Sequence, residues 1–142
     1  MIIFLDIDGV LATRESYSKE ADKLNRECIA NLNILTTELN AHIVISSHWK
    51  YNKHCIWILR TAGVQARIKG VTPSLPNGLH RGYEILEWIE ENKYAGDYLV
   101  LDDDCSDIKG IIPDEKFLHI PDGFIKNGLT KEMVNNVIQR KK

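Results

Sequence analysis

The chain opens on Met1-Ile2-Ile3-Phe4-Leu5-Asp6-Ile7-Asp8-Gly9-Val10-Leu11, an apolar run that ends in two carboxylates and a glycine. The apolar run predicts a buried strand over residues 2–6. Because side chains alternate between the faces of a strand, Asp6 and Asp8 share one face and Ile7 points to the other. The stretch therefore predicts a strand that carries two acids to its carboxyl end, where one can attack while the other handles protons.

A hairpin is the alternative interpretation of this stretch, because Asp-Gly between apolar residues is a strong turn signal. In a hairpin, Asp8 and Gly9 would form the turn and Asp6 would only flank it. However, only residues 10–12 follow before the polar run Thr13-Arg14-Glu15-Ser16. A return strand of this length is poor, so the pattern favours the open strand.

A second apolar run, residues 98–101, leads into Asp102, Asp103 and Asp104. Acidic runs are usually solvated loops, but these three carboxylates follow a buried strand and repel one another. A like-charge pair ~4 Å apart costs about 1 kcal/mol in water and about 4 kcal/mol near a protein surface. A divalent cation removes this cost, and Mg²⁺ prefers carboxylates combined with water and phosphate. The two acidic strand ends therefore predict one shared Mg²⁺ site.

Length and composition limit the classes of protein. The 142 residues fit one domain, residues 1–142, and a net charge of -2 indicates no general affinity for nucleic acid. No apolar stretch approaches ~18 residues, so we expect no membrane span. The N-terminus lacks signal-peptide features, and the three cysteines form no C-x-x-C pair, so we expect a reduced, cytoplasmic protein. His48, His54 and Cys55 lack the paired spacing of a zinc site.

Strands alternate with helices along the rest of the chain. Periodicity and turn residues predict strands over residues 42–46, 65–72, 98–101 and 117–120, and helices over residues 22–39, 52–62, 82–92 and 130–138. This alternation predicts an α/β fold with a parallel sheet and helices on both faces. Sites in such open sheets form at the carboxyl ends of strands. The residues predicted to stand there are Asp6, Asp8, Ser46, Ser47 and Asp102 to Asp104.

With these motifs the chain resembles the haloacid dehalogenase (HAD) superfamily of phosphohydrolases over almost its whole length. The first family motif, D-x-D-G at a strand end, is matched by Asp6-Ile7-Asp8-Gly9. The second motif is a Ser or Thr after a strand, matched by either Ser46 or Ser47. The third, a Lys or Arg, is best matched by Arg81. The fourth, an acid pair after a strand, is matched by Asp102-Asp103, with Asp107 as a further candidate. The resemblance implies a HAD-type, Rossmann-like sheet.

Within the superfamily, the chain is most similar to the HAD domain of Swiss Army Knife RNA repair proteins. The segments that carry this similarity are residues 45–49, 70–73, 80–85, 101–104 and 128–130. More distantly, the chain resembles the phosphatase domain of polynucleotide kinase–phosphatases. These resemblances imply a phosphorylated nucleic-acid end or a nucleotide as substrate.

The intervals between the motifs are short, so we expect a minimal cap domain or none. The resulting open mouth favours a bulky or polymeric substrate. Candidate contacts to a phosphate backbone are Arg14, Lys50, Lys53 and Arg67, with Arg14 and Lys50 preferred because they follow the motif-bearing strands. His48 and Trp49 either line the site or pack in the core.

The resemblance implies a Mg²⁺-dependent phosphomonoesterase with an aspartyl-phosphate intermediate. Asp6 would be the nucleophile, and Asp8 the general acid and then the general base. Mg²⁺ would be held by Asp6, Asp102, Asp103 and the backbone carbonyl of Asp8.

The remaining motif residues are expected to bind the phosphoryl group. Ser46 or Ser47 would hydrogen-bond a phosphoryl oxygen. Arg81 would offset its charge through planar donors suited to phosphate.

Two other functions remain open at the level of sequence. One is a phospho-accepting receiver domain, but receivers carry adjacent acids at the first strand and the acceptor at the third. Here the second acidic cluster follows the fourth predicted strand. The other is a weakly catalytic HAD-fold module that binds a partner, against which the complete motif set argues.

Overall fold

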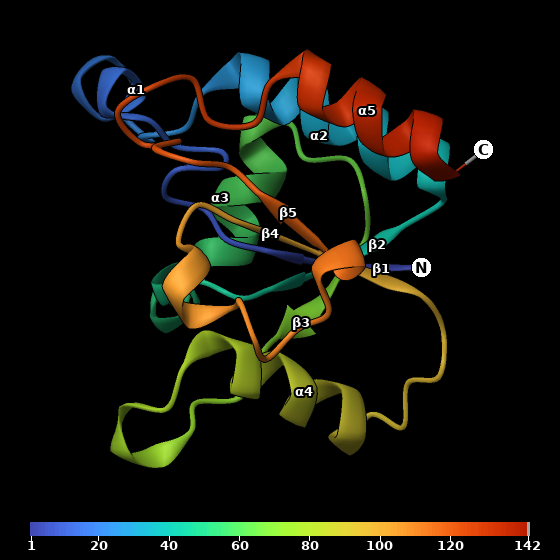
Figure 1. Cartoon of the computed structure of the whole chain (residues 1–142). Helices are drawn as coiled ribbons and strands as arrows, with labels where there is room; N and C mark the ends of the chain where they lie inside the picture. Colours follow the sequence, from blue (N-terminus) through green and yellow to red (C-terminus); the bar gives the residue numbers. More distant parts are fainter. Residues whose placement is uncertain (142) are drawn as a thin grey trace.

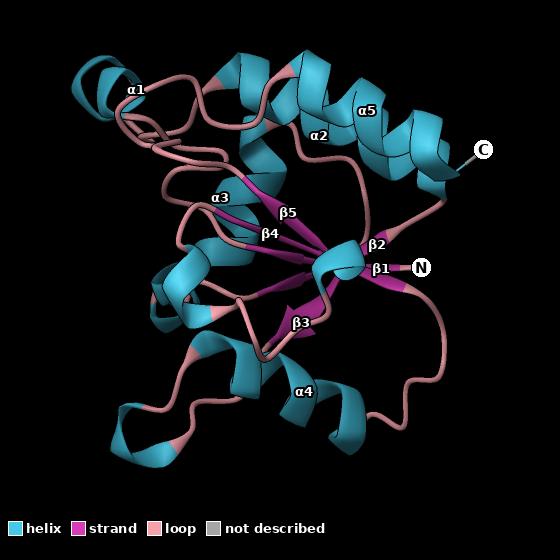
Figure 2. Cartoon of the chain, in the orientation of Figure 1, coloured by secondary structure: helices cyan, strands magenta, loops and turns pink. Residues whose placement is uncertain are grey.

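The computed structural model describes residues 1–141, except for the side chain of Asn77. Five parallel strands form one sheet in the order β3-β2-β1-β4-β5 (Figure 2). The strands are β1 (Ile2–Leu5), β2 (His42–Ile45), β3 (Ile68–Val71), β4 (Tyr98–Asp102) and β5 (Phe117–His119). The predicted α/β, Rossmann-like parallel sheet is confirmed. Because β1 lies at the centre with parallel neighbours on both sides, the hairpin alternative is wrong.

Helices cover both faces of the sheet (Figure 1). One face packs against α2 (Arg26–Leu39), α3 (Cys55–Ala62) and α5 (Lys131–Lys141), and the other against α4 (Arg81–Glu91). Strand alternation divides β1 between the two cores: Ile3 and Leu5 face the three helices, and Ile2 and Phe4 face α4. The next residue along this alternation, Asp6, therefore belongs to the α4 side of the sheet.

The connections between these elements are short. They contain α1 (Arg14–Lys19) and the 3₁₀ turns η1 (His48–Tyr51), η2 (Pro76–Gly78), η3 (Cys105–Asp107) and η4 (Asp114–Lys116). Within residues 1–141 there is no cap domain between the motifs, as expected. None of the helices in this part of the chain is both long enough and apolar enough to cross a bilayer.

Side-chain caps decide where two helices begin. The helix predicted over residues 22–39 begins only at Arg26, because the Asn25 Oδ1 accepts from the N–H groups of Glu27 at 2.9 Å and Cys28 at 3.1 Å. The polar stretch 13–20 contains α1, which the sequence analysis did not predict. Its cap is Thr13, whose hydroxyl oxygen accepts from the Ser16 N–H at 3.2 Å.

The strand order also separates this fold from a receiver domain. Receiver-type sheets have the order 2-1-3-4-5, whereas β1 here lies between β2 and β4. Moreover, β3 ends at Val71 and is followed by Thr72, so no acceptor carboxylate stands at its end. The receiver alternative is therefore not supported.

Candidate active site

Strand register brings three motif residues to the same level of the sheet. Leu5 pairs with both Ile45 and Leu101, so the residues that follow them are also neighbours. The side chains of Leu5, Ile45 and Leu101 lie in the core beneath α2. Because side chains alternate along a strand, those of the residues that follow point toward α4. The three residues placed in this way are Asp6, Ser46 and Asp102. They meet at the carboxyl edge of the three central strands, where the sequence predicted a site.

Three carboxylates form a cluster at this edge. Asp6, Asp102 and Asp103 each contribute one oxygen, and these oxygens all lie within 4.8 Å of one another. Asp6 is 4% exposed and Asp102 is fully buried. Burial, together with the negative charge of Asp102, raises the pKa of Asp6 well above its usual value. Burial also raises the pKa of Asp102. The cluster is therefore short of positive charge.

Arg81 supplies part of that charge. It is the first residue of α4, and its Nη1 lies 2.7 Å from Asp102 Oδ2 and 3.4 Å from Asp6 Oδ2. Burial alone would lower the pKa of Arg81, but the two carboxylates outweigh it and raise the pKa above its ordinary value. The structure thus brings the expected third-motif cation to the expected nucleophile.

The donor set fits a hard divalent cation. One guanidinium cannot neutralise three carboxylates, and the donors are all oxygens, as Mg²⁺ prefers. The backbone carbonyl of Asp8 accepts no hydrogen bond from any residue in 1–141, so it is also free to ligate.

Gly9 allows the two acidic loops to approach each other. The carbonyl oxygen of Ile7 accepts hydrogen bonds from the next turn, and Gly9 has a φ of 83° there. A Cβ at this position would overlap the carboxylate of Asp103. A glycine is therefore needed both for the left-handed backbone and for the space that Asp103 occupies.

The Asp8 side chain lies outside the carboxylate cluster. Its Oδ1 accepts from the Tyr17 hydroxyl at 2.6 Å and from the Trp49 indole Nε1 at 3.1 Å. Burial and this contact raise the pKa of Tyr17 to about 12, so Tyr17 remains a donor at neutral pH. Sequence reasoning left the role of Trp49 open between packing and site; Trp49 does both, because it also packs against the core. The sequence pattern did not identify Tyr17, because this residue belongs to no motif.

The two candidate serines of the second motif differ in their partners. The Ser47 hydroxyl oxygen caps η1 by accepting from the Trp49 N–H at 3.2 Å. The Ser46 hydroxyl is buried and has no partner among the described residues. A buried hydroxyl without a partner costs free energy unless a ligand supplies one. Ser46 is therefore the better candidate for a phosphoryl oxygen.

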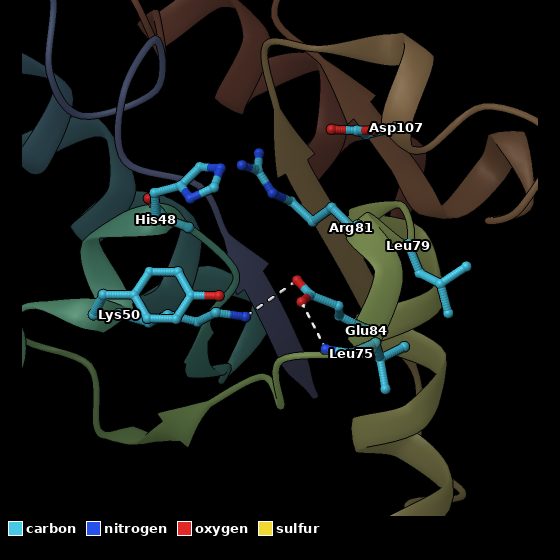
Figure 3. A pocket seen from close by; sticks show the side chains of 10 residues that line it. His48, Lys50, Leu75, Leu79, Arg81, Glu84 and Asp107 are labelled. Atoms are coloured by element: carbon cyan, nitrogen blue, oxygen red, sulfur yellow. Dashed lines mark hydrogen bonds and ion pairs between the residues drawn. The ribbon is translucent and has the colours of Figure 1, made fainter.

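A pocket of about 230 Å³ opens beside the carboxylate cluster. Arg81, which pairs with Asp6 and Asp102, also lines this pocket (Figure 3), so the pocket adjoins the site. A second pocket, of about 330 Å³, lies against Tyr17 and Trp49, and His48 lines both pockets.

Comparison with known families agrees with this geometry. A family model described as the HAD domain in Swiss Army Knife RNA repair proteins matches residues 2–134. The chain belongs to this family. No curated protein and no solved structure matches the chain. The family supports a hydrolase of the HAD type, and HAD domains generally use Mg²⁺ and phosphorylated substrates.

Two of the basic residues expected to contact a substrate backbone are not placed to do so in this HAD domain. The Lys50 side chain is only 5% exposed, and its Nζ lies 3.1 Å from Glu84 Oε1. Arg67 directly precedes β3 and so lies at the amino edge of the sheet, opposite the site. Arg14 and Lys53 are both exposed. Asp107, the further fourth-motif candidate, pairs with His80 at 2.6 Å and lines the pocket.

Proposed function

We propose that this HAD domain is a Mg²⁺-dependent phosphomonoesterase that forms an aspartyl-phosphate on Asp6. The observation that carries the proposal is the surroundings of Asp6: a buried carboxylate beside Arg81, within 4.8 Å of oxygens from Asp102 and Asp103. A nucleophile that approaches a phosphate dianion needs positive charge around it; Arg81 supplies part of that charge, and a cation held by the three carboxylates would supply the rest.

The chain's own residues supply the two chemical steps. Asp6 attacks phosphorus, and the bond from phosphorus to the leaving oxygen breaks as Asp8 gives that oxygen a proton. Asp8, now a carboxylate, then takes a proton from the water that hydrolyses the aspartyl-phosphate. Tyr17 and Trp49 both donate to Oδ1 of Asp8, which leaves Oδ2 to carry the proton.

Other residues of the site offset the negative charge of the phosphoryl group during these steps. Ser46 donates to a phosphoryl oxygen, and Arg81 offsets the negative charge of the phosphoryl group. Mg²⁺ would be held by Asp6, Asp102, Asp103 and the Asp8 carbonyl, and when bound it would neutralise charge between carboxylate and phosphate.

A phosphorylated nucleic-acid end or a nucleotide is the proposed substrate. The family description concerns RNA repair proteins, and no cap within residues 1–141 encloses the mouth of the site. An open site makes few contacts to a small ester, so binding energy must come from the rest of a larger substrate.

The activity is tested by measuring phosphate release from three classes of ester: phosphorylated oligonucleotides, mononucleotides and sugar phosphates, with 4-nitrophenyl phosphate as a generic reference. We expect release in Mg²⁺, none in excess EDTA, and none from Asp6→Asn. Full activity after complete metal removal, or wild-type rates in a folded Asp6→Asn sample, would contradict the proposal.

A further inference from the structure

The pocket beside Arg81 has two facing walls. One comes from η1 and carries His48 and Tyr51. The other comes from α4 and the segment before it, and Figure 3 shows Leu75 and Leu79 on this side and His48 on the other. At about 230 Å³ the pocket is smaller than the ~300 Å³ at which sites for drug-sized ligands begin. It therefore has room for one planar group and not for a length of polymer.

The ion pair in the pocket lining already has its hydrogen-bond partners within the protein. The Lys50 ammonium donates to the Thr72 hydroxyl at 3.2 Å, the Pro73 carbonyl at 3.3 Å and Glu84 Oε1 at 3.1 Å. Its three protons are thus all used, and the other oxygen of Glu84 accepts from the Leu75 N–H at 3.4 Å. This ion pair fixes the walls of the pocket, and neither of its two charges is free for a ligand.

The charges that line the pocket cancel. Lys50 and Arg81 are positive, and Glu84 and Asp107 are negative. A balanced lining gives no field to attract a second phosphate or another anion. It suits a neutral group with polar edges.

The outer part of the pocket is apolar and aromatic. The Tyr51 side chain is 65% exposed and Leu79 is 48% exposed. The Tyr51 hydroxyl lies 2.8 Å from the Ser74 hydroxyl, so the ring is held in place although its surface is open. The His48 ring lies beside it, with centroids 6.0 Å apart. A fixed and open aromatic ring, in a pocket that Leu75 and Leu79 also line, is a surface on which a nucleobase stacks.

We propose that this pocket binds the nucleobase of the nucleotide whose phosphate reacts at Asp6. This assignment rests on the proposed phosphatase function. It specifies the nucleobase as the part of the substrate that the pocket recognises. Arg81 links the two places, because it contacts Asp6 at 3.4 Å and also lines the pocket. The second pocket, against Tyr17 and Trp49, does not include Arg81.

The first experiment compares two phosphorylated oligonucleotides that differ only in the nucleotide bearing the phosphate, which is either intact or abasic. We expect the ratio of kcat/KM, intact over abasic, to be about tenfold in the wild type. Tyr51→Ala should bring the ratio close to one, and Tyr51→Phe should keep it, because the ring remains. Trp57→Ala is the matched control, since Trp57 is 68% exposed and lies outside the pocket; its ratio should equal that of the wild type.

Equilibrium binding tests the pocket without turnover. In the Asp6→Asn protein, a nucleoside monophosphate should bind about tenfold more tightly than ribose phosphate, and Tyr51→Ala should remove the difference. Equal binding of the two ligands, or a ratio of one in the first experiment with a wild-type enzyme that hydrolyses 4-nitrophenyl phosphate, would overturn the base pocket alone. If the wild-type protein in Mg²⁺ hydrolyses none of the esters while the base-selective binding is observed, the phosphatase function is overturned and the base pocket stands.

Discussion

The surroundings of Asp8 fit its proposed role as the general acid. Tyr17 reaches it from α1 and Trp49 reaches it from η1, and both donate to the same oxygen. Two donors on one oxygen fix the orientation of the carboxyl group. A general acid gains from this, because proton transfer depends on its distance from the leaving oxygen.

Tyr17→Phe should reveal this positioning. The change removes the 2.6 Å hydrogen bond but keeps the ring that packs edge-on against Phe124. We expect kcat on an alkyl phosphate to fall about tenfold, or ~1.4 kcal/mol, with little change on 4-nitrophenyl phosphate, whose leaving group needs no proton. The matched control is Tyr94→Phe, which removes a 2.6 Å bond to the Asp97 carbonyl far from the site. Equal losses on both esters would argue against a role through Asp8.

Ser46 and Ser47 can be distinguished by separating stability from activity. Ser46→Ala removes a buried hydroxyl that has no partner in residues 1–141, so Tm should hold or rise while kcat/KM falls. Ser47→Ala removes the cap of η1 and should cost about 1 kcal/mol of stability. Calorimetry and steady-state kinetics on both variants test the assignment. Unchanged kcat/KM in Ser46→Ala would move the role to Ser47.

At the scale of elements, Asp97 ties the start of β4 to two distant segments. Its carboxylate accepts from Lys116 of η4 at 2.6 Å and from Lys141 of α5 at 2.8 Å. These hydrogen bonds lower the pKa of Asp97 below its ordinary value of 3.8. A lowered folded-state pKa means that the stability it contributes is full above the ordinary pKa and is lost as the pH falls below it.

Asp97→Asn should therefore lower Tm at neutral pH and flatten the loss of stability below about pH 4. The effect should be at most about 1 kcal/mol, because both ion pairs are partly exposed. Thermal unfolding from pH 7 to pH 3 measures it, with Asp122→Asn, an exposed pair on a loop, as the control. An Asp97→Asn curve parallel to that of the wild type would show that the pairs do not stabilise the fold.

The elements that sequence predicted best are those whose pattern is local. β1, β2 and β4 are short apolar runs that end in polar motif residues, so their place and the site at their ends followed from periodicity. α1 could not be found this way, because Arg14–Lys19 is short and polar and depends on the Thr13 cap. The contacts of Tyr17 with Asp8 and of Lys50 with Glu84 join side chains from different segments of the fold, and no spacing rule in the sequence predicts them.

At the scale of the whole molecule, a net charge of -2 leaves attraction to nucleic acid to local residues. Arg14 is exposed and begins α1, close in sequence to Asp8. We expect Arg14→Gln to lower kcat/KM on a phosphorylated oligonucleotide severalfold and to weaken its dependence on salt. Arg67→Gln, at the opposite edge of the sheet, is the control and should change neither. Equal kcat/KM for oligonucleotide and mononucleotide at low salt would exclude a polymeric substrate.

Covalent phosphorylation of Asp6 is the central step of the proposed function. In Asp8→Asn the nucleophile remains, and 4-nitrophenyl phosphate needs no acid, but the water that releases phosphate lacks its base. Intact-mass and peptide mass spectrometry after rapid quenching in Mg²⁺ should therefore find one phosphoryl group, located on Asp6. Continued turnover with no phosphorylated protein, or a phosphoryl group on any other residue, would contradict the account.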